Sequence, residues 1–209
     1  MKHAYASLII LLIGVLLGCT ENKEIKLLEN NDSTDFVREI PNRTIEKSFL
    51  NYNRKISLWT LNNAPYSGYA VSYYSDSTLK EKIGILNGKT ESRSLTFYED
   101  GHLQQLSNYH NGKLHGEKKF WSSNTSHVLL SHLNYQFGKP HGEQKTWYPT
   151  GELHKKLNMH MGKEDGIQQA YRKNSALYAN YEAKEGRIFG LKKTALCFGL
   201  EDENIQYEK

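Results

Sequence analysis

Residues 111–121 read NGKLHGEKKFW, and residues 137–147 read FGKPHGEQKTW. Both stretches contain GK-x-HGE, and in both a tryptophan follows the second glycine by five residues. The same spacing extends along the chain in both directions. The last residue of each GK-x-x-G-like unit recurs at steps of 24, 24, 26, 24 and 24 residues: Gly68, Ser92, Gly116, Gly142, Gly166 and Gly190. Self-similarity at such a period indicates a repeat architecture.

Two columns of apolar residues keep this register. Five residues after each of the first five marks there is an aromatic residue, at Tyr73, Phe97, Trp121, Trp147 and Tyr171. Eleven residues after each mark, once a two-residue insertion in the third unit is allowed for, there is a leucine, at Leu79, Leu103, Leu129, Leu153 and Leu177. A register kept over five units indicates that each unit has the same structure.

The pattern inside each unit is that of a β-hairpin. After each leucine, alternate positions stay mainly apolar, as at Leu153, Leu157 and Met159, and the residues between them are mostly polar. This period of two marks a half-buried strand, and Asn87-Gly88 has the composition of a tight turn with positive φ. A single hairpin is not stable, so neighbouring units must stack. We therefore predict an all-β fold, an elongated antiparallel meander of tandem β-hairpin repeats.

The N-terminus has the features of a signal peptide. Lys2 precedes an apolar run from Leu8 to Leu17, which is too short to span a bilayer as a helix but suits a signal-peptide core. The close of this run, LLGC at residues 16–19, resembles the lipobox of bacterial lipoproteins. The resemblance implies that residues 1–18 are removed and that Cys19 is the site of lipid attachment. The alternative is an ordinary buried N-terminal helix.

Lipidation would make the protein membrane-anchored through its N-terminus. Thr20 stands where an aspartate would often mark retention in the inner membrane, so the resemblance implies the bacterial outer membrane, on its periplasmic or its surface face. Residues 19–49 are polar and are expected to form a tether, and residues 192–209 a C-terminal cap or tail.

The hairpins resemble those of the MORN-repeat variant family, whose bacterial members are often lipoproteins. The resemblance covers residues 56–191, the expected repeat domain, and implies a MORN-like hairpin array. Ser92 and Ser175 replace glycines of the pattern, and the third unit has the insertion SSNTSH at residues 122–127. These departures concern the regularity of the turns and not the architecture.

The composition argues against several function classes. The formal net charge is +4 with both signs interspersed, whereas nucleic-acid binding usually shows a concentrated basic patch. With lipid on Cys19, Cys197 has no partner for an intramolecular disulfide and is expected to be a buried apolar residue. No nucleophile elbow, HExxH motif or phosphate-binding loop occurs. We expect no enzyme activity, no catalytic residues and no cofactor.

The histidines are the obvious candidates for metal ligands. His115 and His141 occupy the same repeat position, and equivalent positions lie about 10 Å apart in such a meander. Ligands that share a zinc ion each lie about 2.1 Å from it. We therefore interpret these two histidines as repeat consensus and predict no metal site. His132 and His154 are expected on a solvated sheet face.

The aromatic column defined above, Tyr73, Phe97, Trp121, Trp147 and Tyr171, has two interpretations: a packed core, or an exposed ridge for interactions. The leading hypothesis is a non-catalytic, lipid-anchored binding or scaffolding protein of the cell envelope, with an envelope protein as partner and this column as candidate surface. The alternative is binding of cell-wall or surface glycans. A third, an antitoxin-like role, comes only from a label in the family and requires a cytoplasmic partner, which conflicts with the export signal. The sequence leaves the oligomeric state open.

Overall fold

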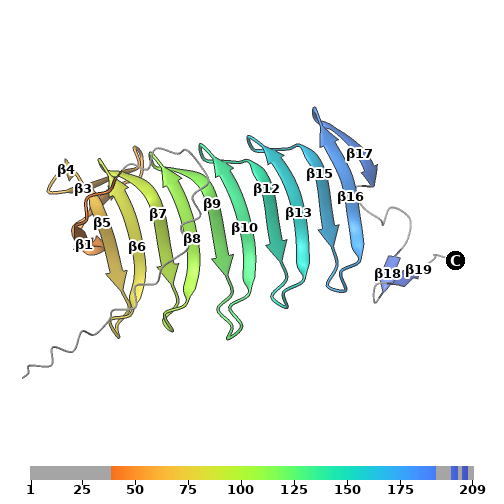
Figure 1. The fold of residues 1–209 in the computed structure, drawn as a ribbon, viewed down its shortest axis with the longest axis horizontal. Coiled ribbons are helices and arrows are strands. Elements are labelled where there is room, and N and C mark those ends of the chain that lie inside the picture. Colours follow the sequence, from red (N-terminus) through yellow and green to blue (C-terminus); the bar gives the residue numbers. More distant parts are fainter. Residues whose placement is uncertain (1–38, 192–198, 202–203, 207–209) are drawn as a thin grey trace, which may run out of the picture. The chain divides into compact units, whose positions relative to one another are not determined.

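The computed structural model describes residues 39–191, 199–201 and 204–206, all within one compact unit of residues 37–209. The described residues form β-strands, turns and one short 3-10 helix, η1, without an α-helix among them (Figure 1), which confirms the predicted all-β repeat fold. The elements are β1 (Thr44–Glu46), η1 (Lys47–Phe49), β2 (Asn51–Asn53), β3 (Leu58–Leu61), β4 (Ala64–Pro65), β5 (Gly68–Tyr73), β6 (Leu79–Leu86), β7 (Lys89–Phe97), β8 (Leu103–His110), β9 (Lys113–Trp121), β10 (Leu129–Gln136), β11 (Lys139–Pro140), β12 (Gly142–Trp147), β13 (Leu153–His160), β14 (Lys163–Glu164), β15 (Gly166–Tyr171), β16 (Leu177–Lys184), β17 (Arg187–Leu191), β18 (Gly199–Glu201) and β19 (Asn204–Gln206).

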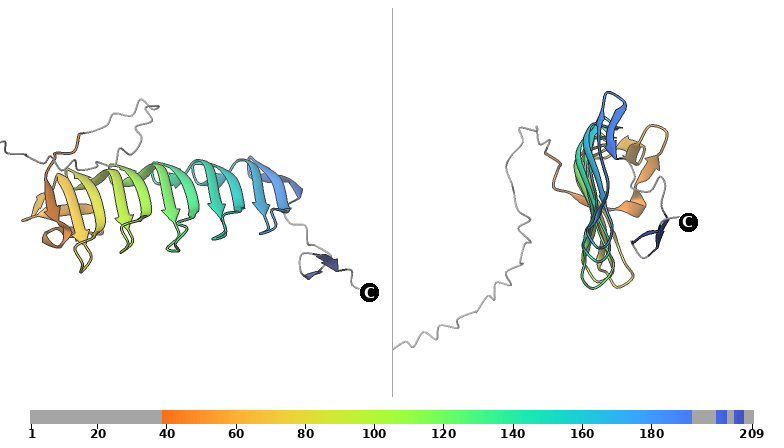
Figure 2. Two further views of the ribbon diagram at one scale, coloured as in Figure 1. Left: turned by 60° about the horizontal axis from the view of Figure 1, so that its bottom comes forward. Right: turned by 90° about the vertical axis from the view of Figure 1, so that its right-hand side faces the viewer.

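One 14-stranded sheet holds the repeats. Its order is β1-β5-β6-β7-β8-β9-β10-β12-β13-β15-β16-β17, with β11 beside β10 and β14 beside β13. From β5 onward, strands that are consecutive along this path pair antiparallel, as predicted for a meander. Only β1 runs parallel to its neighbour, with Thr44 opposite Tyr69. The sheet is a single twisted layer, seen nearly edge-on on the right of Figure 2.

Two-residue turns with positive φ at both residues connect the hairpins at one end of the sheet. They are Asn87-Gly88, Asn111-Gly112, Phe137-Gly138, Met161-Gly162 and Glu185-Gly186. Positive φ at both positions is the requirement of the turn whose twist matches that of the flanking strands. The Asn-Gly pairs were predicted from the sequence, and three further pairs adopt the same φ sign without asparagine.

The repeat mark is also a position of positive φ. Gly116 and Gly142 have φ values of 86° and 81°, and Ser92, which replaces the glycine, has a φ of 59°. Ser175 likewise keeps a positive φ, of 64°. The backbone of the repeat therefore stays regular at both serines.

The pairing register separates an apolar face from a polar face. Leu133, Tyr135, Leu157 and Met159 lie on the apolar face, because they alternate along β10 and β13 with residues that pair on the opposite face. On the polar face, cross-strand pairs join charged and polar side chains: His132 with Lys119 and with Lys145, Lys145 with Lys156, and Glu143 with Asn158.

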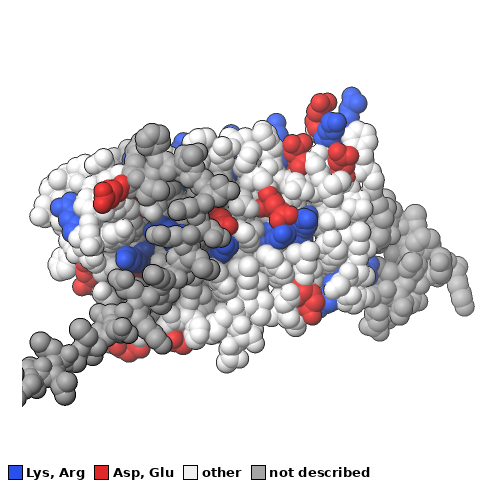
Figure 3. All heavy atoms as spheres, in the orientation of Figure 1, with Lys and Arg blue, Asp and Glu red and all other residues white. Residues whose placement is uncertain are grey.

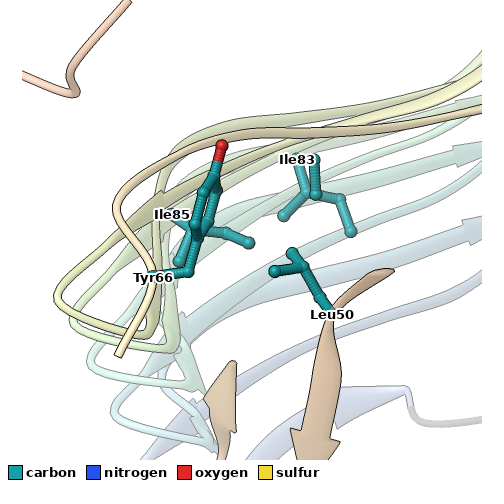
Figure 4. Close-up of a cluster of buried hydrophobic side chains, with 5 residues drawn as sticks. Leu50, Tyr66, Ile83 and Ile85 are labelled. Atoms are coloured by element: carbon teal, nitrogen blue, oxygen red, sulfur yellow. The ribbon is translucent and has the colours of Figure 1, made fainter. Parts of the chain in front are cut away.

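Strands β2, β3 and β4 form a separate three-stranded sheet that covers the apolar face at β5 and β6. Leu50 and Tyr66 pack there against Ala70, Ile83 and Ile85 (Figure 4). Trp59 and Leu61 pack against this cluster and are partly buried. This is the main core of the described chain.

The expected boundaries differ at the N-terminal side. We expected a polar tether up to residue 49, yet β1 (Thr44–Glu46) is a strand of the main sheet and Ile40 is buried. The segment is polar overall, but its few apolar residues pack against the sheet. Ile40 lies so close to the backbone of Gly84 that a Cβ added there would be 2.6 Å from Ile40 Cδ1. At the other end, β18 and β19 pair with each other. The cap or tail expected for residues 192–209 falls mostly outside the described residues and stays a prediction.

A ladder of tyrosines links consecutive repeats at the end of the sheet opposite the two-residue turns. After three aromatics of the column the next residue is a tyrosine, which donates its hydroxyl to a backbone carbonyl of the next repeat: Tyr74 to Phe97 (2.8 Å), Tyr98 to Trp121 (2.6 Å) and Tyr148 to Tyr171 (2.9 Å). Ser122 takes the equivalent position in the third unit, at the start of the insertion. There its hydroxyl instead donates to the side chain of Asn124 and accepts from the backbone N–H of Val128.

Candidate functional site

The aromatic column lies at strand ends, next to bulges in the partner strands. Alternation along each strand puts it on the polar face, since Trp121 follows Lys119 and Trp147 follows Lys145 by two residues. The pairing register shifts just before Tyr73, Phe97, Trp147 and Tyr171, and it shifts on the partner strand opposite Trp121. Bulges re-aim the side chains at strand ends. Each aromatic residue pairs across the strand with a leucine of the second column, as Trp147 does with Leu153. The two columns thus form one band, which we call the aromatic–leucine band.

The band is neither a closed core nor a fully exposed ridge. Tyr73 is 52% exposed and Leu177 is 43% exposed, while the other eight members, Leu79, Phe97, Leu103, Trp121, Leu129, Trp147, Leu153 and Tyr171, are half-buried. Trp121 and Trp147 are thus accessible in part. Both interpretations made from the sequence therefore describe the band in part, and its use for binding stays a proposal.

On the polar face, charged side chains form ion pairs with residues of the same strand or of the neighbouring strand. Lys145 Nζ lies 2.5 Å and Lys156 Nζ 3.3 Å from the carboxylate of Glu143. The hydrogen bond from Lys145 is the main reason that the pKa of Glu143 is lowered. Charges of both signs are interspersed among other residues in the view of Figure 3. This arrangement fits a solvated sheet surface and offers no concentrated charge of one sign.

The histidines of the polar face follow the same pattern. His132 Nε2 lies 3.0 Å from Glu117, and His110 Nδ1 lies 2.8 Å from the buried Glu91. Burial lowers the pKa of His154, with a smaller contribution from the charge of Lys155. Among these described histidines, each one pairs with its own neighbours in the sheet, so they do not converge on a common point.

His115 and His141 have a structural task. Nδ1 of His115 accepts from the backbone N–H of Phe137 at 3.5 Å, and Nδ1 of His141 accepts from that of Met161 at 3.4 Å. Glu91, at the equivalent position, accepts from the backbone N–H of Asn111 at 2.8 Å. These side chains tie each repeat to the turn of the next one. The repeated HGE sequence is thereby explained by the packing of successive hairpins.

Sequence reasoning missed one cluster. Asp100, His102 and His127 lie in neighbouring turns and bring potential ligand atoms within 4.8 Å of one another. The prediction of no metal site weighed the repeated histidines and those of the polar face, but not His102 and His127. The available signal was the coincidence of two departures from the pattern, a histidine after the turn Asp100-Gly101 and a second one in the insertion. Sequence distance alone does not show that these turns are adjacent.

Two segments match the family model of the MORN repeat variant, residues 91–111 and 140–160. The chain contains MORN-variant repeats. The matched segments correspond to β7–β8 and to the region from β11–β12 to β13, and the unit with the insertion lies between them. No curated protein matches the chain.

MORN-variant repeats support a repeat-based binding or scaffolding role, since such repeats are in general binding modules without catalytic activity. Among the described residues, no helix is long and apolar enough to cross a membrane. Cys19, the expected lipid attachment site, lies outside the described residues.

Proposed function

We propose that this MORN-variant protein is a lipid-anchored, non-catalytic scaffold of the bacterial cell envelope that binds an envelope protein through the aromatic–leucine band. The repeats support the binding role. The anchoring and the location rest on the lipobox-like segment that ends at Cys19. The partner and the binding surface are our inference from the band.

One observation carries the choice of surface. From β7 to β13 no apolar residue is fully buried in the described structure, and the four buried residues there, Glu91, Ser107, Ser122 and Gln144, are all polar. The apolar side chains of these strands, those of the band among them, are therefore partly in water. A contiguous, partly exposed apolar patch is typical of an interaction site.

The shape of the band favours a protein partner. Its members lie along successive strands that are about 4.8 Å apart, so the band is a long row and not a pocket. Large aromatic side chains in such a row provide the anchors that dominate protein interfaces. The charged residues beside the band are paired to one another and offer less, because paired surface charges contribute little net binding energy.

The test is capture from intact cells. After cross-linking, the full chain is recovered through a tag at Lys209 and the attached protein is identified. We expect one abundant envelope protein, lost with Trp147→Ser and with Leu153→Ser. Lys156→Ser is the matched control, because Lys156 lies on β13 and on the same face as Trp147 but outside the band. Equal capture by all variants, with unchanged thermal stability, would contradict the assignment of the band.

Anchoring is tested separately. We expect cells that are given a clickable palmitate analogue to label the wild-type chain and not Cys19→Ala, which should leave the membrane fraction. If Cys19→Ala stayed labelled and membrane-bound, the lipid attachment site would be elsewhere. A soluble Cys19→Ala that still captures the partner in vitro would separate the role of the anchor from that of the band.

Glycan binding is the second candidate, because Trp121 and Trp147 are half-buried and not enclosed. Aromatic rings that remain accessible can stack on sugar rings. Recovery of peptidoglycan or surface-glycan fragments without a stoichiometric protein, lost on Trp147→Ser, would favour this candidate over a protein partner.

A further inference from the structure

Two histidines and one aspartate meet at the end of the sheet where the tyrosine ladder is interrupted. The imidazole rings of His102 and His127 stack with centroids 3.6 Å apart and planes 13° from parallel. Asp100 Oδ1 lies 3.3 Å from His102 Nδ1, and Asp100 Oδ2 lies 3.6 Å from His127 Nε2. One carboxylate thus faces both imidazoles.

The repeat itself does not require these histidines. The equivalents of His102 in the other turns are Thr78, Val128, Glu152 and Ala176. The equivalents of His127 are Ser77, Gly101, Gly151 and Ser175, which all have positive φ, as His127 does with 43°. His127 therefore stands at a backbone position that favours glycine, at the end of an insertion that other units lack.

One carboxylate oxygen of Asp100 accepts a hydrogen bond within its turn, and the other oxygen is available to bind a ligand. Its Oδ1 accepts from the backbone N–H of His102 at 3.0 Å, as Asp76 does from Thr78 and Asn174 from Ala176 in their turns. Oδ2 points toward His127.

Hydrogen bonding within the cluster is incomplete. Nδ1 of His127 is buried and has no hydrogen-bond partner in the described structure. A divalent cation would take lone pairs from the two imidazoles and balance the carboxylate.

The distances suit such an ion. Zinc lies about 2.0–2.2 Å from nitrogen and oxygen ligands, which places neighbouring ligand atoms of a tetrahedron about 3.4 Å apart. The separations of 3.3 and 3.6 Å, each from a different oxygen of Asp100, are of that size, and all the candidate ligand atoms lie within 4.8 Å of one another. The stacked rings must turn for both imidazoles to face one ion. His102 and Asp100 have side chains that are 58% and 50% exposed, so the rings are free to adjust and the ion can enter from solvent.

We propose that Asp100, His102 and His127 bind one transition-metal dication of the zinc type. With three protein ligands the ion keeps one coordination position open, for water or for a side chain of a bound partner. The site lies on the turns beyond the aromatic–leucine band, and it stands independently of the function proposed above.

The test is titration of the full chain, freed of metal and without a histidine tag, with ZnCl2 in a calorimeter. We expect one ion per chain, a higher melting temperature with zinc, and a Co²⁺ spectrum without thiolate charge-transfer bands, since none of the three proposed ligands is a cysteine. His127→Gly and His102→Thr introduce residues that the chain itself uses at equivalent turns, so both should fold and both should lose the stoichiometric binding.

His132→Asn is the control, because this histidine pairs with Glu117 on the polar face. It should bind zinc as the wild type does. Absence of stoichiometric binding in the wild type would overturn the proposal. So would unchanged binding in His127→Gly and His102→Thr, which would point to another pair, such as His141 and His160, whose rings lie 5.0 Å apart.

Discussion

At the position of Ser92 the backbone has a φ of 59°, the left-handed conformation that the glycine of the other repeats adopts. This left-handed conformation costs a residue with a Cβ atom roughly 1–2 kcal/mol. We predict that Ser92→Gly raises the free energy of unfolding by about 1 kcal/mol, since relief of this strain exceeds the extra unfolded-state entropy of glycine. Urea denaturation with an unchanged m-value is the measurement.

The reverse substitution provides the comparison. An added Cβ at Gly142 would meet nothing closer than Asn134 Cβ at 3.8 Å, so space is available and only the φ of 81° opposes it. Gly142→Ala should therefore lower the free energy of unfolding by about 1–2 kcal/mol. A neutral Gly142→Ala would show that the turn can relax out of the left-handed conformation.

His154 makes stability depend on pH in a predictable direction. Burial lowers its pKa from the ordinary value of 6.5, so the folded state prefers the neutral imidazole. The unfolded chain then binds the proton more readily, and the stability due to His154 is complete above pH 6.5 and is lost as the pH falls through the lowered pKa. We expect melting temperature to fall from pH 7 to pH 5 less steeply in His154→Asn. Parallel curves for the two proteins would contradict this prediction.

At the scale of elements, hairpins are joined by side chains as well as by strand pairing. The hydroxyl of Tyr98 donates to the carbonyl of Trp121, and Tyr98→Phe leaves this acceptor without its partner. We predict a loss of about 1 kcal/mol in the free energy of unfolding. Tyr73→Phe, at an exposed position, is the matched control and should change it little. Equal effects of both substitutions would show that the ladder does not couple the repeats.

Buried glutamine side chains replace missing backbone hydrogen bonds where a strand is interrupted at the repeat mark. Gln144 donates to the carbonyl of Asn134 at 2.8 Å and accepts from its N–H at 3.1 Å, and Gln168 does the same with Asn158 at 2.7 and 3.2 Å. Each side-chain amide thus replaces a missing backbone partner. In the sequence these glutamines read as ordinary residues of a strand, because their burial depends on the neighbouring repeat.

At the scale of the whole molecule, burial is concentrated where β2–β4 cover the sheet. Leu50 is 8% exposed in this core, whereas Leu133 on the uncovered middle of the apolar face is half-buried. We predict that Leu50→Ala costs about 2–4 kcal/mol of unfolding free energy. Leu133→Ala should cost less, since part of its side chain already contacts water. Hydrogen exchange should show the strongest protection in β5 and β6, and uniform protection along the sheet would contradict this view.

The sequence by itself determined the repeat period, the hairpins and the two faces of the sheet, because alternation of apolar residues and the chemistry of tight turns act between residues that are close in the chain. The MORN-variant architecture follows from these local signals repeated five times. Only the tertiary structure decided how residues 44–66 cover one end of the apolar face, and that Asp100, His102 and His127 meet. Both depend on contacts between segments in different units, and such contacts leave no periodic signal in a single sequence.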